Sequence, residues 1–380
     1  MREEAAGGGA VGEGAECGDG AGVIGEGAER GGGAGAMREG AGRVGGAGAV
    51  GEGAELGGAG RAVREFARRD GDAGAGVGAA GRHHGELLQG ALARDGELVS
   101  CLITMPAPGA GSSARYMPGE ALAPVPASGP AGEAAQPQLL ILPRWKTKAE
   151  RAARLALAFI GAPLVGRLEI ECAVATGVGL GSSTCDVVAA IRAVCDAHGV
   201  RLGAADVARL AIEAEGAADP IMFEGEAVLF AQRQGRVLES FGRWIPAFTV
   251  LSLDTDAGGA GIDTLALPLP DYTTADVNLF ESLVARVREA FRRRDADAVA
   301  AAATESAMLN QRFLPMRKFS ELRAFAHEHR ALGIQISHSG TVAGVLFDPQ
   351  RVPAAGDRAV QMMQRAGDLG VRPLGLFNTG

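Results

Sequence analysis

Residues 177–186, GVGLGSSTCD, place three glycines at every second position between a segment with strand character and one with helix character. The preceding residues, 166–175, alternate apolar and polar side chains, which predicts a half-buried strand. Residues 183–199 carry an apolar face at helical spacing. Glycine permits positive φ angles and close approach to the backbone, so a strand passes directly into a helix here and gathers several N–H groups around one small concavity.

Such a concavity at a helix N-terminus suits a phosphate group, because unpaired N–H donors and the positive end of the helix dipole meet there. Ser182 and Ser183 stand where hydroxyls cap a helix or contact a phosphate oxygen or Mg²⁺. The stretch lacks both the GK[ST] ending of the P-loop and the GxGxxG spacing of the dinucleotide fold. Two interpretations therefore stay open: a phosphate-binding loop, or a glycine-rich turn with a serine cap.

Residues 1–80 are mostly Gly and Ala, and Phe66 is their only aromatic residue. A VGEGAE-like unit recurs every 13 residues, a period of neither collagen nor solenoid repeats. Such a segment buries too little apolar surface to offset its ordering entropy. We expect a disordered low-complexity tail without an assigned function, and a misplaced start codon is the alternative.

Charge and cysteine usage limit the expected partners. The tail carries 8 Arg against 13 Asp and Glu, a net charge of −5, so only about −3 of the total of −8 belongs to residues 81–380. This balance argues against nucleic acid and membrane surfaces as partners. No segment has the apolar length of a membrane span or signal-peptide core. Five scattered cysteines without a CxxC pair predict a reducing, cytoplasmic setting and no structural zinc.

From residue 81 onward, the order of helical and strand patterns predicts an α+β fold of about two domains. Residues 85–105 predict two short strands around a turn at Asp95-Gly96, and 106–137 predict a long loop. The further strands are expected at 139–143, 166–175, 227–242 (a hairpin), 248–255, 334–338, 342–347 and 371–377, and the helices at 148–161, 183–199, 204–215, 276–294, 295–310, 318–332 and 356–367.

Three segments, taken in order, resemble the motifs of the GHMP kinases, a superfamily of galactokinase, homoserine kinase, mevalonate kinase and phosphomevalonate kinase. They are GRHHGELLQG (81–90), GVGLGSSTCD (177–186) and ISHSGTVAGVLFD (336–348). The resemblance covers roughly residues 81–380. It implies a two-domain GHMP kinase-like fold, with an N-terminal ribosomal-protein-S5-like, ATP-binding lobe at 81–242 and a C-terminal ferredoxin-like lobe at 243–380.

Within the superfamily, the chain resembles the L-threonine kinases of the cobalamin pathway. The shared stretches are GELLQG, VSC, SSTCD, DPIMFEG, GIDT and SHSGTVAG. The chain departs from that type at His83-His84, where a cysteine usually precedes Gly-Glu, and in the 106–137 segment. Both departures fall on the side where the substrate is expected, so the resemblance supports a kinase more strongly than it supports threonine.

The resemblance implies roles for particular residues. Asp219 orients or deprotonates the substrate hydroxyl, although Asp219-Pro220 is equally typical of a turn. Ser183 assists the transfer, and Asp186 is a weaker candidate for contacting a substrate amino group. The nucleotide is expected at Gly177, Gly179, Leu180, Gly181, Ser182, Ser183 and Thr184, and the substrate at His84, Glu86, Ser339, Gly340 and Thr341.

Mg²⁺ prefers oxygen ligands and is usually held by one or two protein groups together with phosphates. Glu215 matches the metal-binding glutamate of the family, and Ser183 would be the second ligand. Glu213 is the rival. The two glutamates lie on different faces of one helix, so only one of them can face the phosphates.

The expected activity is ATP-dependent phosphorylation of a small amino-acid-like alcohol, first L-threonine to O-phospho-L-threonine and next homoserine or another small alcohol. The expected cofactors are ATP and Mg²⁺. The expected partner is that alcohol, and a homodimer stays open. The alternative is a non-catalytic descendant that senses a nucleotide or metabolite, suggested by the departures at His83-His84 and in residues 106–137.

Overall fold

The computed structural model describes residues 74–119, 139–172, 181–257, 259, 262, 264, 266–267 and 270–380. All of these belong to one compact unit. The predicted tail up to residue 73, including Cys17, lies outside the described residues, and so does the segment 120–138. The α+β prediction is confirmed, because helices and strands alternate irregularly around one sheet.

Two long strands, β1 (Gly76–Arg94) and β2 (Glu97–Pro118), form an antiparallel hairpin. It turns at Asp95 and Gly96, whose φ angles of 53° and 81° are those of a tight hairpin turn, as predicted. Two sequence predictions are wrong here. The tail was expected to reach residue 80, but β1 begins at Gly76, and the expected loop from 106 is part of β2 as far as Pro118.

Glycine explains the first of these errors, because it was taken as a sign of disorder and acts in β1 as a packing residue. A β-carbon on Gly76 would lie 2.1 Å from the backbone N of Ala197, and one on Gly78 would lie 2.1 Å from the carbonyl O of Ala189. The absence of side chains therefore allows helix α3 (Ser182–Ala197) to lie directly against β1.

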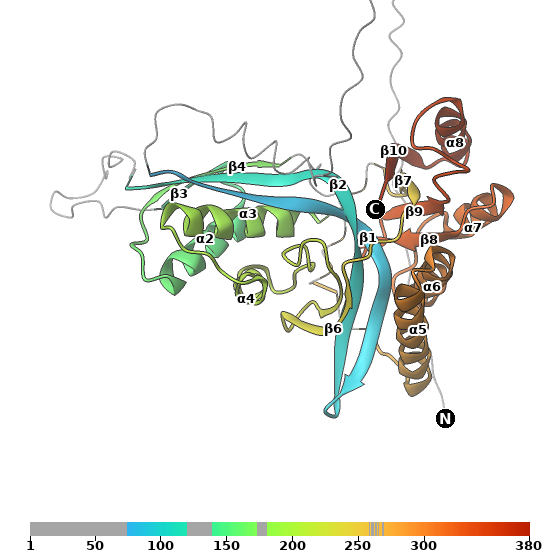
Figure 1. Cartoon of the computed structure of the whole chain (residues 1–380), viewed down its shortest axis with the longest axis horizontal. Helices are drawn as coiled ribbons and strands as arrows, with labels where there is room; N and C mark the ends of the chain where they lie inside the picture. Colours follow the sequence, from blue (N-terminus) through green and yellow to red (C-terminus); the bar gives the residue numbers. More distant parts are fainter. Residues whose placement is uncertain are drawn as a thin grey trace, which may run out of the picture. The chain divides into compact units, whose positions relative to one another are not determined.

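The first part of the fold extends the sheet beyond β2 in the order β4 (Gly166–Cys172), β3 (Leu139–Leu142). Helices α2 (Thr147–Phe159) and α3 cover one face of these strands, and α4 (Ala204–Glu215) packs against these two helices (Figure 1). Their apolar faces share one core with β1, β2, β3 and β4. The predicted hairpin over 227–242 follows, formed by β5 (Ala227–Ala231) and β6 (Arg236–Gly242) with a turn at residues 232–235, and β5 pairs with β2.

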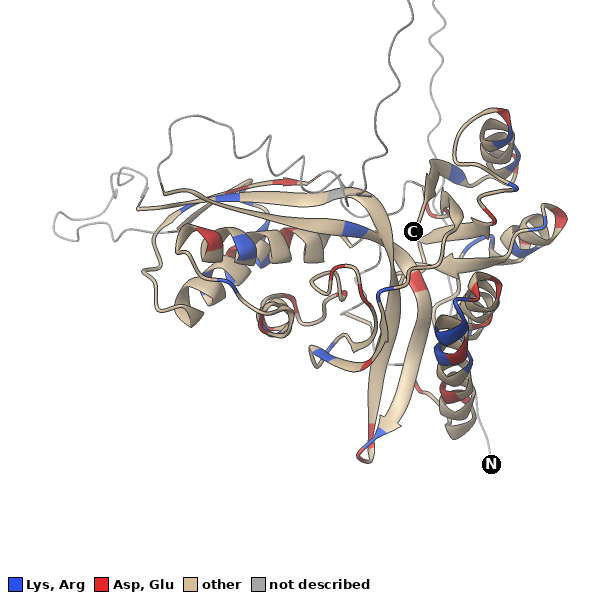
Figure 2. Cartoon of the chain, viewed as in Figure 1, with Lys and Arg blue, Asp and Glu red and all other residues tan. Residues whose placement is uncertain are grey.

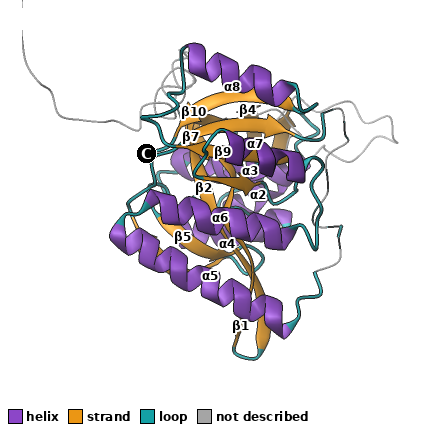
Figure 3. Cartoon of the chain, turned by 90° about the vertical axis from the view of Figure 1, so that its right-hand side faces the viewer, coloured by secondary structure: helices purple, strands orange, loops and turns teal. Residues whose placement is uncertain are grey.

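The second part extends the sheet on the other side of β1, in the order β8 (Gly333–Ile336), β9 (Val342–Phe347), β7 (Thr249–Asp254), β10 (Arg372–Asn378). Its helices are α5 (Thr274–Arg293), α6 (Ala296–Asn310), α7 (Phe319–Glu328) and α8 (Asp357–Gly367), which lie together on one side of these strands (Figure 3).

Strand β1 joins the two parts, because Glu86 pairs with Ile336 of β8 and makes the sheet continuous. The expected boundary between two lobes after residue 242 stays a prediction. Charged residues of both signs are interspersed along the helices (Figure 2). On α5 they form ion pairs, such as Arg286 with Glu305 of α6 and Arg288 with Glu239 of β6. No described helix has the length and apolarity needed to cross a membrane.

Candidate functional site

Ser183 connects the first turn of α3 to the end of α4. Gly181 is the N-cap of α3, with a φ of 68°, and no side chain caps this helix. Ser183 instead donates a hydrogen bond from Oγ to Oε2 of Glu215, 2.7 Å away. The sequence left open whether Ser183 only caps its helix. The structure directs its hydroxyl across to the neighbouring helix.

Glu215 has the properties expected of a cation ligand. Its side chain is buried, and Oε1 has no hydrogen-bond partner. Burial raises the pKa of Glu215 to about 7, although hydrogen bonds from Ser183 and Thr184 favour the ionised form. Its rival Glu213 is exposed on the same helix. A buried carboxylate oxygen without a protein partner, beside a serine hydroxyl, is a donor set that fits Mg²⁺.

Only part of the expected nucleotide-binding segment is described. Gly177, Gly179 and Leu180 lie in the segment 173–180, outside the described residues. Of the remainder, Gly181 to Thr184 form the start of α3, next to Glu215 and the loop that follows α4. Thr184 is buried, and its Oγ1 lies 3.5 Å from the backbone N of Asp219.

His83 of β1 and Asp219 form an ion pair, with 2.8 Å between Nε2 and Oδ2. His83 is buried, and its Nδ1 has no partner. Burial alone lowers the pKa of His83, but the charge and hydrogen bond of Asp219 and the charge of Glu86 outweigh it and raise that pKa. Burial raises the pKa of Asp219, but the charge and hydrogen bond of His83 lower it by more. The net effect is a pKa below the ordinary range of an aspartate. The pair therefore favours an ionised Asp219.

The ring of His83 also packs against the start of α3. A β-carbon on Gly181 would lie 1.7 Å from Nε2 of His83. Only glycine at this position leaves room for the imidazole. The contact places the His83–Asp219 pair next to the end of the glycine stretch.

Glu86 is the second buried carboxyl group of this region. Its Oε2 accepts a hydrogen bond from Oγ1 of Thr104 at 2.6 Å, and its Oε1 has no partner. Burial, followed by the negative charge of Asp219, raises the pKa of Glu86 to about 8. Glu86 was expected at the substrate, and the structure brings it close enough to His83 and Asp219 for their charges to interact.

His84 is directed to a different environment from His83. Its Nε2 lies 2.7 Å from Oγ of Ser252, and its Nδ1 contacts Nε2 of Gln335. Burial and the neighbouring His83 lower its pKa to about 3, so it stays neutral. His84 was expected at the substrate, whereas the histidine beside Asp219 is His83. The available signal was strand alternation, because adjacent residues face opposite sides and only one histidine can face the helices.

The C-terminal motif forms a tight turn between β8 and β9. Gly340 has a φ of 70°, and its N–H donates to the carbonyl O of Ser337 at 2.9 Å. Hydroxyl groups line the turn, with Oγ of Ser339 at 3.0 Å from Oγ of Ser337 and 2.8 Å from Oγ1 of Thr341. These contacts lie within the turn itself, so they are consistent with a conformational role as well as with substrate contact.

His338 links this turn to Asp219. Its Nδ1 lies 3.1 Å from Oε1 of Gln89, a residue of the first motif. Burial lowers the pKa of His338, and the charge of Asp219 opposes that effect. The first and third motifs therefore meet around Asp219, although they are about 250 residues apart in the sequence.

Asp186 was considered as a contact for a substrate amino group, but in the structure it contacts the side-chain amino group of Lys146. Its carboxylate forms a buried ion pair with Lys146 and accepts a hydrogen bond from Oγ of Ser112 at 2.6 Å. Lys146, which directly precedes α2, was not predicted from the sequence as the partner of Asp186. This buried ion pair has a structural role, next to the core that α2, α3 and α4 share with strands β1 to β4.

The described residues thus provide two adjacent functions. Ser183 and Glu215 offer oxygen ligands at a helix N-terminus, and His83 with Asp219 offers an ionised carboxylate that can accept a proton. No cluster of three or more His, Cys, Asp or Glu side chains with metal-binding geometry occurs among the described residues. This arrangement suits a reaction in which positioning and charge stabilisation dominate.

Two family models match the chain. The one described as GHMP kinases N terminal domain covers residues 147–224, and the one described as GHMP kinases C terminal covers residues 287–372. The first match spans α2 to just beyond Asp219 and contains Ser183 and Glu215. An L-threonine kinase of Citrobacter freundii is 25% identical over 185 residues, which is 49% of this chain and 63% of that protein. The alignment thus spans less than two thirds of its relative.

Solved structures of similar fold include two small-molecule kinases. A homoserine kinase from Cytophaga hutchinsonii has a TM-score of 0.56 at 14% identity, covering 82% of this chain and 96% of that one. A mevalonate kinase from methicillin-resistant Staphylococcus aureus has a TM-score of 0.51 at 17% identity, covering 80% and 98%. At these identities, the two likenesses concern the fold alone.

Proposed function

Because the chain belongs to the GHMP kinase superfamily, we propose that it transfers the γ-phosphoryl group of ATP to the hydroxyl of a small amino-acid-like alcohol. L-threonine is the first candidate, supported by the Citrobacter freundii relative, and homoserine is the second. The observation that carries the proposal is the contact between Ser183 and Glu215, with an unpartnered Glu215 oxygen beside the His83–Asp219 pair.

The start of α3 would bind the phosphates of the nucleotide through its N–H groups and the hydroxyls of Ser182 to Thr184. Ser183 and Glu215 would hold Mg²⁺, which when bound neutralises phosphate charge. The oxygen of the substrate hydroxyl forms a bond to the γ-phosphorus, and Asp219 accepts the hydroxyl proton. The bond between the γ-phosphorus and the bridging oxygen of the β-phosphate breaks, which releases ADP. His83 keeps Asp219 ionised and oriented for this step.

The substrate would lie between the first and third motifs, where Glu86, Ser339, Gly340 and Thr341 stand on β1 and in the turn after β8. Glu86 has an unpartnered buried oxygen there, which an ammonium group of an amino-acid-like alcohol would satisfy. His84 is engaged by Ser252 and Gln335 and takes no direct part in this proposal. The cobalamin pathway, the cytoplasmic setting and a homodimer stay predictions.

The test is a substrate panel with the full chain, ATP and Mg²⁺, in which ADP release is followed with L-threonine, L-serine, homoserine and mevalonate. We expect alcohol-dependent ADP release with threonine as the best substrate. The variant Glu215→Gln should lower kcat/KM by about a hundredfold or more, because the amide is a neutral and weaker metal ligand. Its kcat should recover partly at high Mg²⁺.

The matched control is Glu213→Gln, an exposed glutamate on the same helix, which should behave like the parent protein. If no alcohol stimulates ADP release while ATP still binds, the proposal is overturned in favour of a non-catalytic nucleotide sensor. Two departures from the L-threonine kinases, at His83-His84 and in residues 106–137, suggested that alternative, and the structure weakens both reasons. His83 is paired with Asp219, and the start of the unusual 106–137 segment is an ordinary strand.

A further inference from the structure

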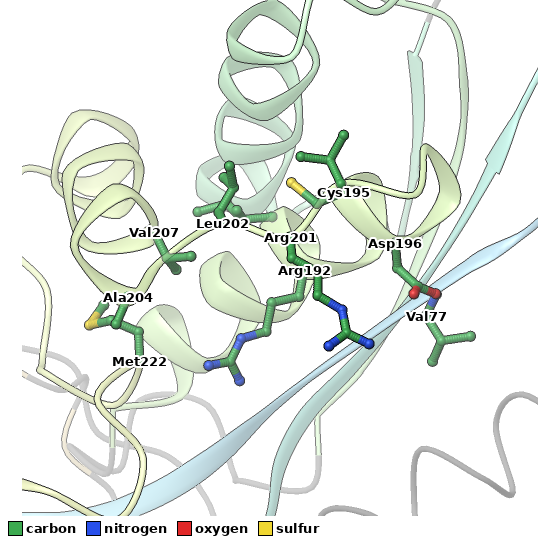
Figure 4. A pocket seen from close by; sticks show the side chains of 11 residues that line it. Val77, Arg192, Cys195, Asp196, Arg201, Leu202, Ala204, Val207 and Met222 are labelled. Atoms are coloured by element: carbon green, nitrogen blue, oxygen red, sulfur yellow. The ribbon is translucent and has the colours of Figure 1, made fainter.

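A pocket lies at the other end of α3 from Ser183. It has a volume of about 330 Å³ and is bounded by β1, the second half of α3, the connection from α3 to α4, the beginning of α4 and the segment that follows Asp219. In Figure 4, Val77 and Asp196 stand on one side, Val207 and Met222 stand on the other, and two arginine side chains extend between them. This volume is at the lower end of the range for small-molecule pockets, roughly 300–1,000 Å³.

The lining combines apolar residues with the carboxylate of Asp196 and the guanidinium group of Arg201, which are not paired with each other. Asp196 accepts a hydrogen bond from the backbone N of Val77 at 2.8 Å through Oδ2. Arg201 is exposed and forms no ion pair with any side chain in the described part of the chain. The other arginine, Arg192, is already paired with Glu224 and with the carbonyl O of Ala79.

We propose that this pocket binds an apolar α-amino acid. Its carboxylate would pair with Arg201 and its ammonium with Asp196. Its side chain would pack against Val77, Val200 and Leu202, the half-buried apolar residues of the lining. A zwitterion with an apolar side chain matches this lining in both charge and polarity. Asp196 and Arg201 are both exposed, so each is solvated in the free protein. A simple anion would pair with Arg201 alone and a simple cation with Asp196 alone, whereas the zwitterion makes both charge-assisted contacts.

Three elements that line the pocket, β1, α3 and α4, also carry residues of the candidate active site. Helix α3 has Ser183 at its start and Asp196 near its end, about 20 Å apart at 1.5 Å per residue. Helix α4 has Val207 in its first turn and Glu215 at its end. Met222 follows Asp219 by three residues. We therefore expect a ligand that fixes these elements to change the affinity for a nucleotide, and such a linkage is reciprocal.

The test is isothermal titration of the full chain with L-leucine in the absence of nucleotide. Leucine has no hydroxyl group and cannot be a substrate, so its binding does not depend on the proposed kinase activity. We expect leucine to bind with a Kd of about 1 mM or tighter. The variant Arg201→Gln should bind it about tenfold or more weakly, because a charge-assisted bond is lost. Arg209→Gln is the matched control, since Arg209 is an exposed arginine of α4 outside the pocket.

A second probe tests the role of Asp196. The keto acid 4-methyl-2-oxopentanoate has the carboxylate and side chain of leucine but no ammonium group. It should bind more weakly than leucine, and Asp196→Asn should weaken leucine but not the keto acid. The amide keeps an oxygen that can accept from Val77, so the fold is preserved. The proposal is overturned if leucine, isoleucine and valine all fail to bind, or if Arg201→Gln binds leucine as the parent does.

The link to the active site has its own readout. The Kd of a non-hydrolysable ATP analogue is measured with and without saturating leucine. We expect it to change by about fivefold or more, and an unchanged Kd would refute the coupling while leaving the binding site intact. Absence of kinase activity, by contrast, would overturn the proposed function without affecting the leucine titration.

Discussion

Glu86 is a buried carboxyl group for which the protein provides only one hydrogen bond, from Thr104. Burial raises its pKa to about 8, so the folded protein keeps a proton that the unfolded chain releases near the ordinary glutamate value of about 4.5. Between these values the folded state binds more protons than the unfolded state. Glu86 therefore makes stability fall as pH rises through this window.

The corresponding prediction concerns Glu86→Gln in protein free of metal and substrate. In the parent, the free energy of unfolding should decline between about pH 5 and pH 8, by up to about 1.4 kcal/mol per pH unit from this group. In the variant, that share of the decline should vanish. Urea titrations across the range measure it, with Glu97→Gln at the exposed hairpin tip as control. Equal slopes in parent and variant would contradict the protonated state of Glu86.

At the scale of elements, α3 is flanked by two glycines with almost the same backbone conformation and different surroundings. Gly181 has a φ of 68° and would place a β-carbon 1.7 Å from Nε2 of His83. Gly199 has a φ of 66° and would place its β-carbon in open space. The conformational cost of a side chain is therefore the same at both ends, and only the contact with His83 differs.

We expect Gly199→Ala to cost about 1 kcal/mol of stability and to leave activity unchanged. Gly181→Ala should cost about 1–3 kcal/mol more and lower kcat strongly, because the imidazole must leave Asp219 to make room. Chemical denaturation and steady-state kinetics of the two variants provide the measurement. If both substitutions have the same effect on kcat, the His83 ring does not depend on Gly181.

At the scale of the whole molecule, the β1–β2 hairpin belongs to two cores at once. Ala80 and Ala114 lie in the core beneath α2 and α3, whereas Leu88 and Ile103 lie in the core beneath α5 and α6. The sheet continues through β1 by the pairing of Glu86 with β8. Neither part can lose this hairpin without exposing apolar surface of the other, which couples their unfolding.

The two tryptophans of the chain test this coupling, since Trp145 precedes α2 and Trp244 packs edge-on against Phe291 of α5 at 5.4 Å. Each of the variants Trp145→Phe and Trp244→Phe keeps a single tryptophan. Their fluorescence midpoints in urea should agree with each other and with the loss of helical circular dichroism, after correction for each variant's stability. Two separated transitions would instead support independent lobes divided near residue 242.

The sequence alone determined most of the local elements. The strand before the glycine stretch, helices α3 and α4 and the turn at Asp95-Gly96 follow from side-chain periodicity and turn residues, which depend on neighbours along the chain. The same local rules predicted most strands and helices to within a few residues.

Only the tertiary structure decided which side chains meet. It brought His83, not His84, to Asp219, and it turned Gly76 and Gly78 from apparent disorder into the surface on which α3 rests. It also joined Val77, Asp196, Arg201 and Met222 into a pocket. These features depend on contacts between residues far apart in sequence, and a glycine has the same local preferences whether it faces solvent or the backbone of a helix.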